Sequence, residues 1–92
     1  MPVYAISYDL RNPGRNYEPL WGRLRDWKAQ RVLESLWVID TTSTAVTIRD
    51  DLKLYIDAND RVFVARLSGE TAWNSLQPGG AAWLLARFSK GT

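Results

Sequence analysis

The sequence predicts an α+β fold that forms one domain over residues 1–92. Two observations predict it. Short runs of β-branched and aromatic residues recur along the chain, and two amphipathic segments with helical spacing lie between them. The connections are short, without an internal repeat or an interdomain linker. A chain of this length encloses one modest hydrophobic core.

The first predicted strand runs from Val3 to Asp9 and is apolar on both faces, as is typical of a central strand. The turn residues Asn12, Pro13 and Gly14 end it. A helix from about Tyr17 to Lys28 follows, with Pro19 in its first turn. Its core face is predicted from apolar residues at helical spacing: Leu20, Trp21, Leu24 and Trp27.

Residues 31–40 are predicted to form either two short strands or one long strand with a bend near Ser35. The hydroxyls of residues 42–44 are suited to cap a second helix, which should end near Asp57. The last clear strand is Arg61 to Leu67. Beyond it, residues 71–76 fit an edge strand or an ordered loop, and residues 82–88 a short terminal helix, so the structure of residues 69–92 stays open.

The order β-α-β-β-α-β predicts a ferredoxin-like sandwich, in which an antiparallel sheet carries two helices on one face and the chain ends in a short C-terminal extension. The other sheet face would then be bare. Five Trp and four Tyr are also more aromatic residues than one small core usually encloses. We therefore expect a homodimer that packs sheet against sheet.

The chain has no His and no Cys, which excludes an imidazole base, a thiolate nucleophile and nitrogen or sulfur metal ligands. Any bound metal should be a hard cation, Mg²⁺ or Mn²⁺. There is no apolar stretch of roughly 20 residues and no signal-peptide pattern. We expect a cytoplasmic protein that does not bind membranes.

Asp9 is the candidate catalytic and metal-binding residue, because a carboxylate at the end of a strand can meet a metal or a phosphate. Glu34 is the candidate second metal ligand. Arg11, Arg15 and Arg31 are candidates for nucleic-acid binding, since cations outnumber acids from Arg11 to Arg31 and Arg suits phosphate. Two alternatives stay open: Asp9 could accept hydrogen bonds from the following turn, and these cations could pair with Glu18 or Glu34.

An ordered series of short motifs resembles the CRISPR-associated Cas-two family, and within it the stand-alone relatives often labelled SinR-like. The likeness covers nearly the whole chain. The motifs are Ile6-Ser7-Tyr8-Asp9-Leu10, Pro13-Gly14, Leu33-Glu34-Ser35 with Trp37, Ile48-Arg49-Asp50, Asn59-Asp60 and Gly69-Glu70.

The resemblance implies a ferredoxin-like dimer in which Asp9 of both copies approaches the dimer axis and can hold a divalent cation. It also matches Ser35 to the Ser of the family's bend motif. Two functions follow as expectations. The first is a dimeric nucleic-acid-associated or scaffold protein without strong catalysis, and the alternative is a Mg²⁺-dependent endonuclease built on paired Asp9 carboxylates. Whether the chain is an enzyme, and whether DNA, RNA or a protein is its partner, stays open.

Overall fold

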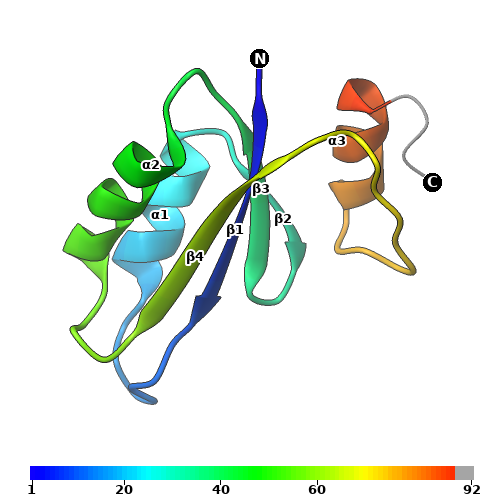
Figure 1. Cartoon of the computed structure of the whole chain (residues 1–92). Coiled ribbons are helices and arrows are strands. Elements are labelled where there is room, and N and C mark those ends of the chain that lie inside the picture. Colours follow the sequence, from blue (N-terminus) through cyan, green and yellow to red (C-terminus); the bar gives the residue numbers. More distant parts are fainter. Residues whose placement is uncertain (89–92) are drawn as a thin grey trace.

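A computed structural model describes residues 1–88 as a four-stranded antiparallel sheet with helices on both faces. The strand order in the sheet is β2-β3-β1-β4. Figure 1 shows α1 and α2 together on one side of the sheet and α3 on the other. The predicted α+β class and the antiparallel sheet are confirmed. The elements are β1 (Val3–Asp9), α1 (Glu18–Asp26), β2 (Gln30–Leu33), β3 (Leu36–Asp40), α2 (Ala45–Leu52), the 3₁₀ turn η1 (Lys53–Tyr55), β4 (Arg61–Leu67) and α3 (Gly80–Arg87).

β1 is a central strand, as its sequence predicts, and pairs with β3 on one side and β4 on the other. Alternate residues of β1 enter the core under α1 and α2. Tyr4, Ile6 and Tyr8 are buried there with Leu20 and Leu24 of α1. The apolar positions predicted for the first helix therefore face the sheet.

The end of α1 lies two residues before the predicted one because the chain closes the helix at Lys28. Lys28 has a left-handed φ of 61°. Its N–H donates to the Arg25 carbonyl at 2.9 Å, and the Ala29 N–H donates to the Leu24 carbonyl at 3.0 Å. This bonding pattern is a Schellman motif, which usually has glycine where Lys28 stands.

Residues 31–40 form two strands, so the first of the two alternatives is right. β2 and β3 are joined by a turn at Glu34 and Ser35, and their register shifts between Arg31 and Leu33. The second helix begins after Thr44, whose side chain accepts a hydrogen bond from the Thr47 N–H at 3.2 Å. It ends at Leu52 and continues as η1, so the predicted end near Asp57 is too late.

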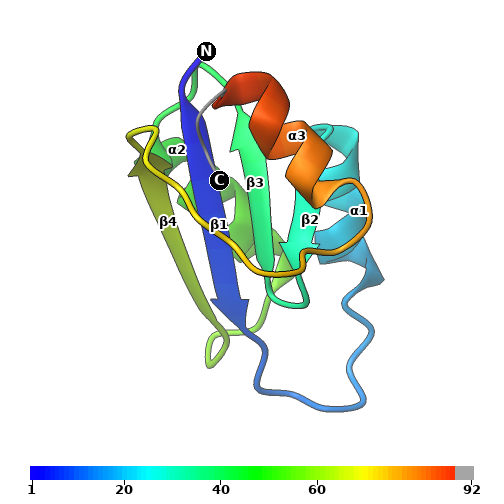
Figure 2. The same cartoon turned by 90° about the vertical axis from the view of Figure 1, so that its right-hand side faces the viewer.

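The sheet face opposite α1 and α2 is not bare, which corrects our expectation. Residues 71–76 form a loop, and α3 packs against β2. In Figure 2 the segment after β4 crosses in front of β1 and β3, and α3 lies over β3 and β2. Val32, Val38 and Leu84 are buried between this segment and the sheet, in a second hydrophobic cluster. The C-terminal segment therefore covers the β2 and β3 half of the face from within the same chain.

The start of α3 lies close to the sheet because Gly80 has no side chain. A Cβ at Gly80 would lie 3.1 Å from the Leu76 side chain and 3.2 Å from Val32. Gly79, just before it, has a left-handed φ of 86°. Within residues 1–88, no helix is long and apolar enough to cross a membrane.

Candidate functional site

Asp9 ends β1 at an exposed corner of the sheet. Its side chain is 66% exposed and lies 3.7 Å from the Arg61 guanidinium and 4.0 Å from that of Arg11. Arg61 is directly opposite on the neighbouring strand. Both contacts are at the long limit of an ion pair and are open to water, so they hold Asp9 only loosely.

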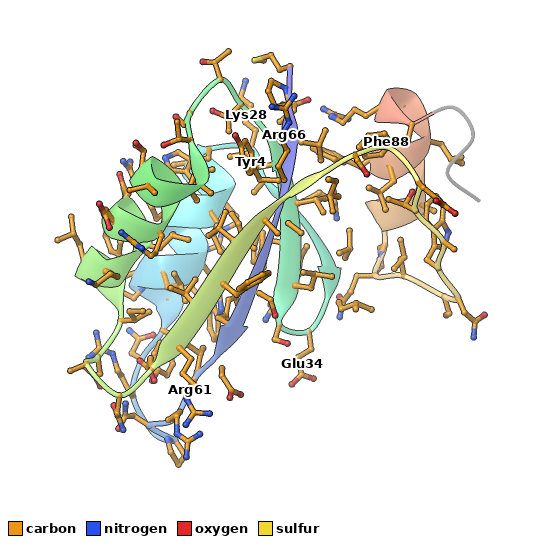
Figure 3. The ribbon with its side chains drawn as sticks, viewed as in Figure 1. Tyr4, Lys28, Glu34, Arg61, Arg66 and Phe88 are labelled. Atoms are coloured by element: carbon orange, nitrogen blue, oxygen red, sulfur yellow. The ribbon has the colours of Figure 1, made fainter. Side chains whose placement is uncertain are left out.

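Beside Asp9 the surface forms a hollow of about 310 Å³, which we call the end hollow. Figure 3 shows Arg61 and Glu34 at this same end of the sheet, on β4 and on the turn between β2 and β3. The end hollow therefore brings together three residues that the sequence singled out: Asp9, Arg31 and Glu34. Its lining includes Tyr8, Asp9, Trp21, Arg31, Glu34 and Ser35.

The inner wall of the hollow is organised by the hydroxyl oxygen of Tyr8. This oxygen accepts hydrogen bonds from the Trp21 and Trp37 indole N–H groups at 3.0 and 3.1 Å. It also accepts one from Arg31 Nη2 at 3.2 Å and donates to the Glu34 carbonyl at 3.3 Å. We call these four side chains, Tyr8, Trp21, Arg31 and Trp37, the Tyr8 cluster. Tyr8 and Trp37 are buried, so neither ring is open for stacking on a base.

Arg31 is fixed on several sides at once. Its guanidinium lies 5.3 Å from the Trp21 ring centre and 5.4 Å from that of Trp37. Its Nε and Nη2 donate to the Glu34 carbonyl at 3.0 and 2.6 Å. The predicted interaction between Arg31 and Glu34 thus exists, but it uses the backbone oxygen of Glu34. No ion pair to the Glu34 carboxylate is found within residues 1–88, so that group is available at the hollow.

The other predicted cations lie apart from the hollow or are paired. Arg15 forms an ion pair with Asp57 and lies 5.5 Å from the Tyr17 ring centre. Glu18 pairs with Arg25 and not with Arg11, Arg15 or Arg31, so the surface pairing that we had left open for Glu18 is wrong. Arg23 binds both oxygens of Asp51, at 3.0 and 2.8 Å. Of Arg11 and Arg15, Arg11 is the one that reaches the edge of the hollow, through its contact with Asp9.

Sequence reasoning missed a second polar cluster, centred on Asp60 before β4. The Asp60 carboxylate accepts hydrogen bonds from the Arg11 N–H at 2.7 Å and the Tyr17 hydroxyl at 2.8 Å. It also accepts from the Asp57 N–H at 2.8 Å and from Asn12 Nδ2 at 3.3 Å. We call this group the Asp60 cluster. The sequence signal was the Asn59-Asp60 pair, which entered above only as one motif of the family resemblance.

The pKa of Asp60 lies below its ordinary value. Burial acts to raise this pKa, but the hydrogen bonds from Arg11, Asp57, Tyr17 and Asn12 together outweigh that effect. Asp60 also takes the role that we had left open for Asp9, because it accepts the backbone N–H at the start of the turn. Asp9 is therefore not needed as an acceptor there.

The carboxylates of Asp9 and Glu34 are the groups of the hollow that could hold a hard cation. Two oxygen ligands suit Mg²⁺, which keeps several of its waters in protein sites. No cluster of three or more acidic, His or Cys side chains suited to a metal occurs within the described part of the chain.

These features define a small α+β protein with a charged hollow at one end of its sheet. No family model matches the chain, and no solved structure matches it at a significant level.

Proposed function

We propose that this chain is a dimeric nucleic-acid-associated or scaffold protein, related to the CRISPR-associated Cas-two family and without strong catalysis. The strand order β2-β3-β1-β4, with α1 and α2 on one face, supports the ferredoxin-like form of the fold. The observation that carries the proposal is the pair of loosely held cations, Arg11 and Arg61, on either side of Asp9 at the end hollow.

The argument rests on how each arginine is already engaged. Arg23 binds Asp51 through two short hydrogen bonds, and such a pair is costly to separate. Arg11 and Arg61 instead meet Asp9 at 4.0 and 3.7 Å in open solvent. Exposed contacts of this length contribute little, so a phosphate group can replace Asp9 as their partner.

The proposed dimer uses the strip of sheet that α3 leaves uncovered. On β4 the Phe63 side chain is 68% exposed. Phe63 pairs across the sheet with Ser7 of β1, whose side chain is too small to cover the ring. A second copy packed on this strip would remove the apolar surface from water.

The test is a titration of labelled DNA and RNA, single-stranded and duplex, followed by fluorescence anisotropy at several salt concentrations. We expect affinity to fall steeply with salt and to vary little with sequence, since phosphates are the main contact. The double variant Arg11→Ala/Arg61→Ala should weaken binding. Arg25→Ala/Arg49→Ala is the matched control, because it removes the same charge from residues already paired with Glu18 and Asp50. Equal effects of the two double variants would refute the assigned surface.

The second candidate function is a Mg²⁺-dependent endonuclease, favoured by the presence of Asp9 and Glu34 in one hollow. Asp9 and Glu34 would hold the cation, and Mg²⁺ would stabilise charge on a phosphate and activate water. Arg11 and Arg61 would orient the phosphate, and Arg31 would add positive charge from the inner wall. Each copy supplies one Asp9 and one Glu34, so the paired Asp9 carboxylates of this hypothesis would come from two copies at the dimer axis.

Cleavage assays with Mg²⁺, Mn²⁺ or EDTA decide between the two functions. Under the endonuclease hypothesis, Asp9→Asn should abolish metal-dependent cleavage, because it keeps the size of the side chain and removes its charge. Glu34→Gln should reduce cleavage. Under the binding hypothesis, pure wild-type protein binds nucleic acid and cleaves none with either metal. Cleavage by Asp9→Asn at the wild-type rate would place the activity elsewhere.

A further inference from the structure

The loop between β1 and α1 is held at both ends by the turn that precedes β4. At the start of the loop, the Arg11 N–H and the Asn12 side chain donate to Asp60. At its end, the Tyr17 hydroxyl donates to the same carboxylate. Figure 1 shows this loop and the turn side by side at one end of the molecule.

In all of these contacts Asp60 is the hydrogen-bond acceptor. Two backbone N–H groups, one hydroxyl and one amide all present hydrogens to the two oxygens of Asp60. A carboxylate is the side chain that accepts several such bonds without presenting a hydrogen of its own. An amide in its place would direct an NH₂ group at one of these donors, so the need here is for the charge of Asp60 and not only for its shape.

The loop has further contacts with the same turn, since Arg15 pairs with Asp57 and Asn12 Nδ2 donates to Asn59 Oδ1 at 2.8 Å. Its middle contains Pro13 and Gly14, and Gly14 has a left-handed φ of 92° at a place where an added Cβ would meet only open space. A turn bond joins the Arg15 N–H to the Asn12 carbonyl at 3.1 Å. Asp60 is the acceptor of the Arg11 N–H itself, so this bond holds the backbone at the residue whose guanidinium lies beside Asp9.

We propose that Asp60 is a positioning residue, which holds the loop so that Arg11 stays beside Asp9 at the end hollow. Asp60 acts on bound phosphate only through Arg11, and this part of the inference rests on the proposed function. The Tyr17 hydroxyl, at the end of the loop next to α1, helps to hold Asp60 in place by donating a hydrogen bond to its carboxylate. The placement of the loop itself is independent of any ligand.

Two variants of neighbouring acids test this placement with the same change in net charge. Asp60→Asn removes the acceptor of the Arg11 N–H, whereas Asp57→Asn removes the partner of Arg15 and leaves that N–H bond in place. By hydrogen exchange followed with NMR, the Arg11 amide should lose protection in Asp60→Asn and keep it in Asp57→Asn. Tyr17→Phe, which removes one donor, should lose part of the protection. Equal protection of Arg11 in Asp60→Asn and wild type would overturn the inference.

The functional arm is a double-mutant cycle for nucleic-acid binding. Asp60→Asn should bind on the order of fivefold more weakly than Asp57→Asn, close to the loss from Arg11→Ala. In an Arg11→Ala background, Asp60→Asn should cause no further loss, because the residue through which it acts is gone. A further loss in that background would overturn the inference. If wild-type protein binds no nucleic acid, the proposed function fails, and exchange of the Arg11 amide alone decides whether Asp60 positions the loop.

Discussion

At the scale of single residues, two oxygen-bearing side chains organise the end of the molecule where the hollow lies. The Tyr8 hydroxyl accepts hydrogen bonds from residues of α1, β2 and β3. The Asp60 carboxylate accepts them from the β1–α1 loop, including Tyr17 just before α1, and from its own turn. Each is costly to replace because several polar groups depend on one acceptor. The two clusters hold Arg31 and the backbone of Arg11, two of the cations at the end hollow.

Tyr8→Phe should destabilise the fold by about 1–3 kcal/mol, because it leaves the buried Trp37 N–H without an acceptor. Urea denaturation measures this loss. The chain has five Trp, so an NMR spectrum of the indole N–H groups contains five signals. Those of Trp21 and Trp37 should move in Tyr8→Phe. Tyr4→Phe is the control, since within residues 1–88 the buried Tyr4 has no hydroxyl hydrogen bond. Equal stability of the two variants would contradict the role of the Tyr8 hydroxyl.

The Asp60 cluster should make stability depend on pH. The pKa of Asp60 is lower in the folded chain than its ordinary value, so its charged form favours folding. This contribution is fully present above the unfolded pKa of about 3.9 and is lost as pH falls through the lower folded pKa. The difference in unfolding free energy between wild type and Asp60→Asn should therefore be constant from pH 7 to about pH 5 and shrink below about pH 4. Urea denaturation across this range tests it, and a difference that stays constant down to pH 2 would be contrary evidence.

At the scale of elements, the helices are short and depend on packing more than on their own propensity. α1 has Pro19 in its first turn and ends in a Schellman motif, and α2 begins with the Thr44 cap. Their stability comes mainly from Leu20 and Leu24 on α1, and Ile48 and Leu52 on α2, which are all buried in the same core.

Leu24→Ala and Ile48→Ala should each destabilise the fold by roughly 2–5 kcal/mol, because both side chains are buried and their truncation leaves cavities. Chemical denaturation gives the values directly. Val46→Ala is the control on α2, since Val46 is 55% exposed and should change stability by less than about 0.5 kcal/mol. A loss at Leu24 or Ile48 no larger than at Val46 would mean that the helix face is wrongly placed.

At the scale of the whole molecule, the sheet is covered unequally on its two faces. α1 and α2 cover one face, and the C-terminal segment covers the β2 and β3 half of the other. The β1 and β4 half keeps the exposed Phe63. Because β4 is also an edge strand, this strip combines apolar surface with unpaired backbone groups, a combination that favours association.

We therefore predict that wild-type protein has a dimer mass by light scattering at micromolar concentrations and that Phe63→Glu is a monomer. In a two-fold symmetric contact, Phe63→Glu would place the carboxylates of both copies close together in an apolar interface, where they would repel each other. The variant should keep its circular dichroism spectrum, because the Phe63 side chain is already mostly in water. Leu85→Glu, on an exposed position of α3, is the control and should remain dimeric. A monomer mass for wild type would remove the proposed dimer.

The sequence by itself determined those strands and helix faces whose apolar residues recur at regular spacing. The alternation of β1, the bounds of β4 and the core face of α1 follow from residues that are close in sequence, and so does the Thr44 cap. The end of α1 did not follow, because Lys28 takes a conformation that sequence patterns assign to glycine. The strand-end position of Asp9 was also predictable, since it requires only the length of β1.

The tertiary structure alone decided which of these residues meet. The Arg11 N–H and Asp60 are 49 residues apart in the chain, and the Tyr8 and Trp37 side chains are 29 apart. A hydrogen bond across such a separation depends on how strands pair and helices pack, which the periodicity of any one segment does not encode. The same reason explains the covered face of the sheet. By sequence, residues 71–76 fit either an ordered loop or an edge strand, and only the space over β2 and β3 selects the loop.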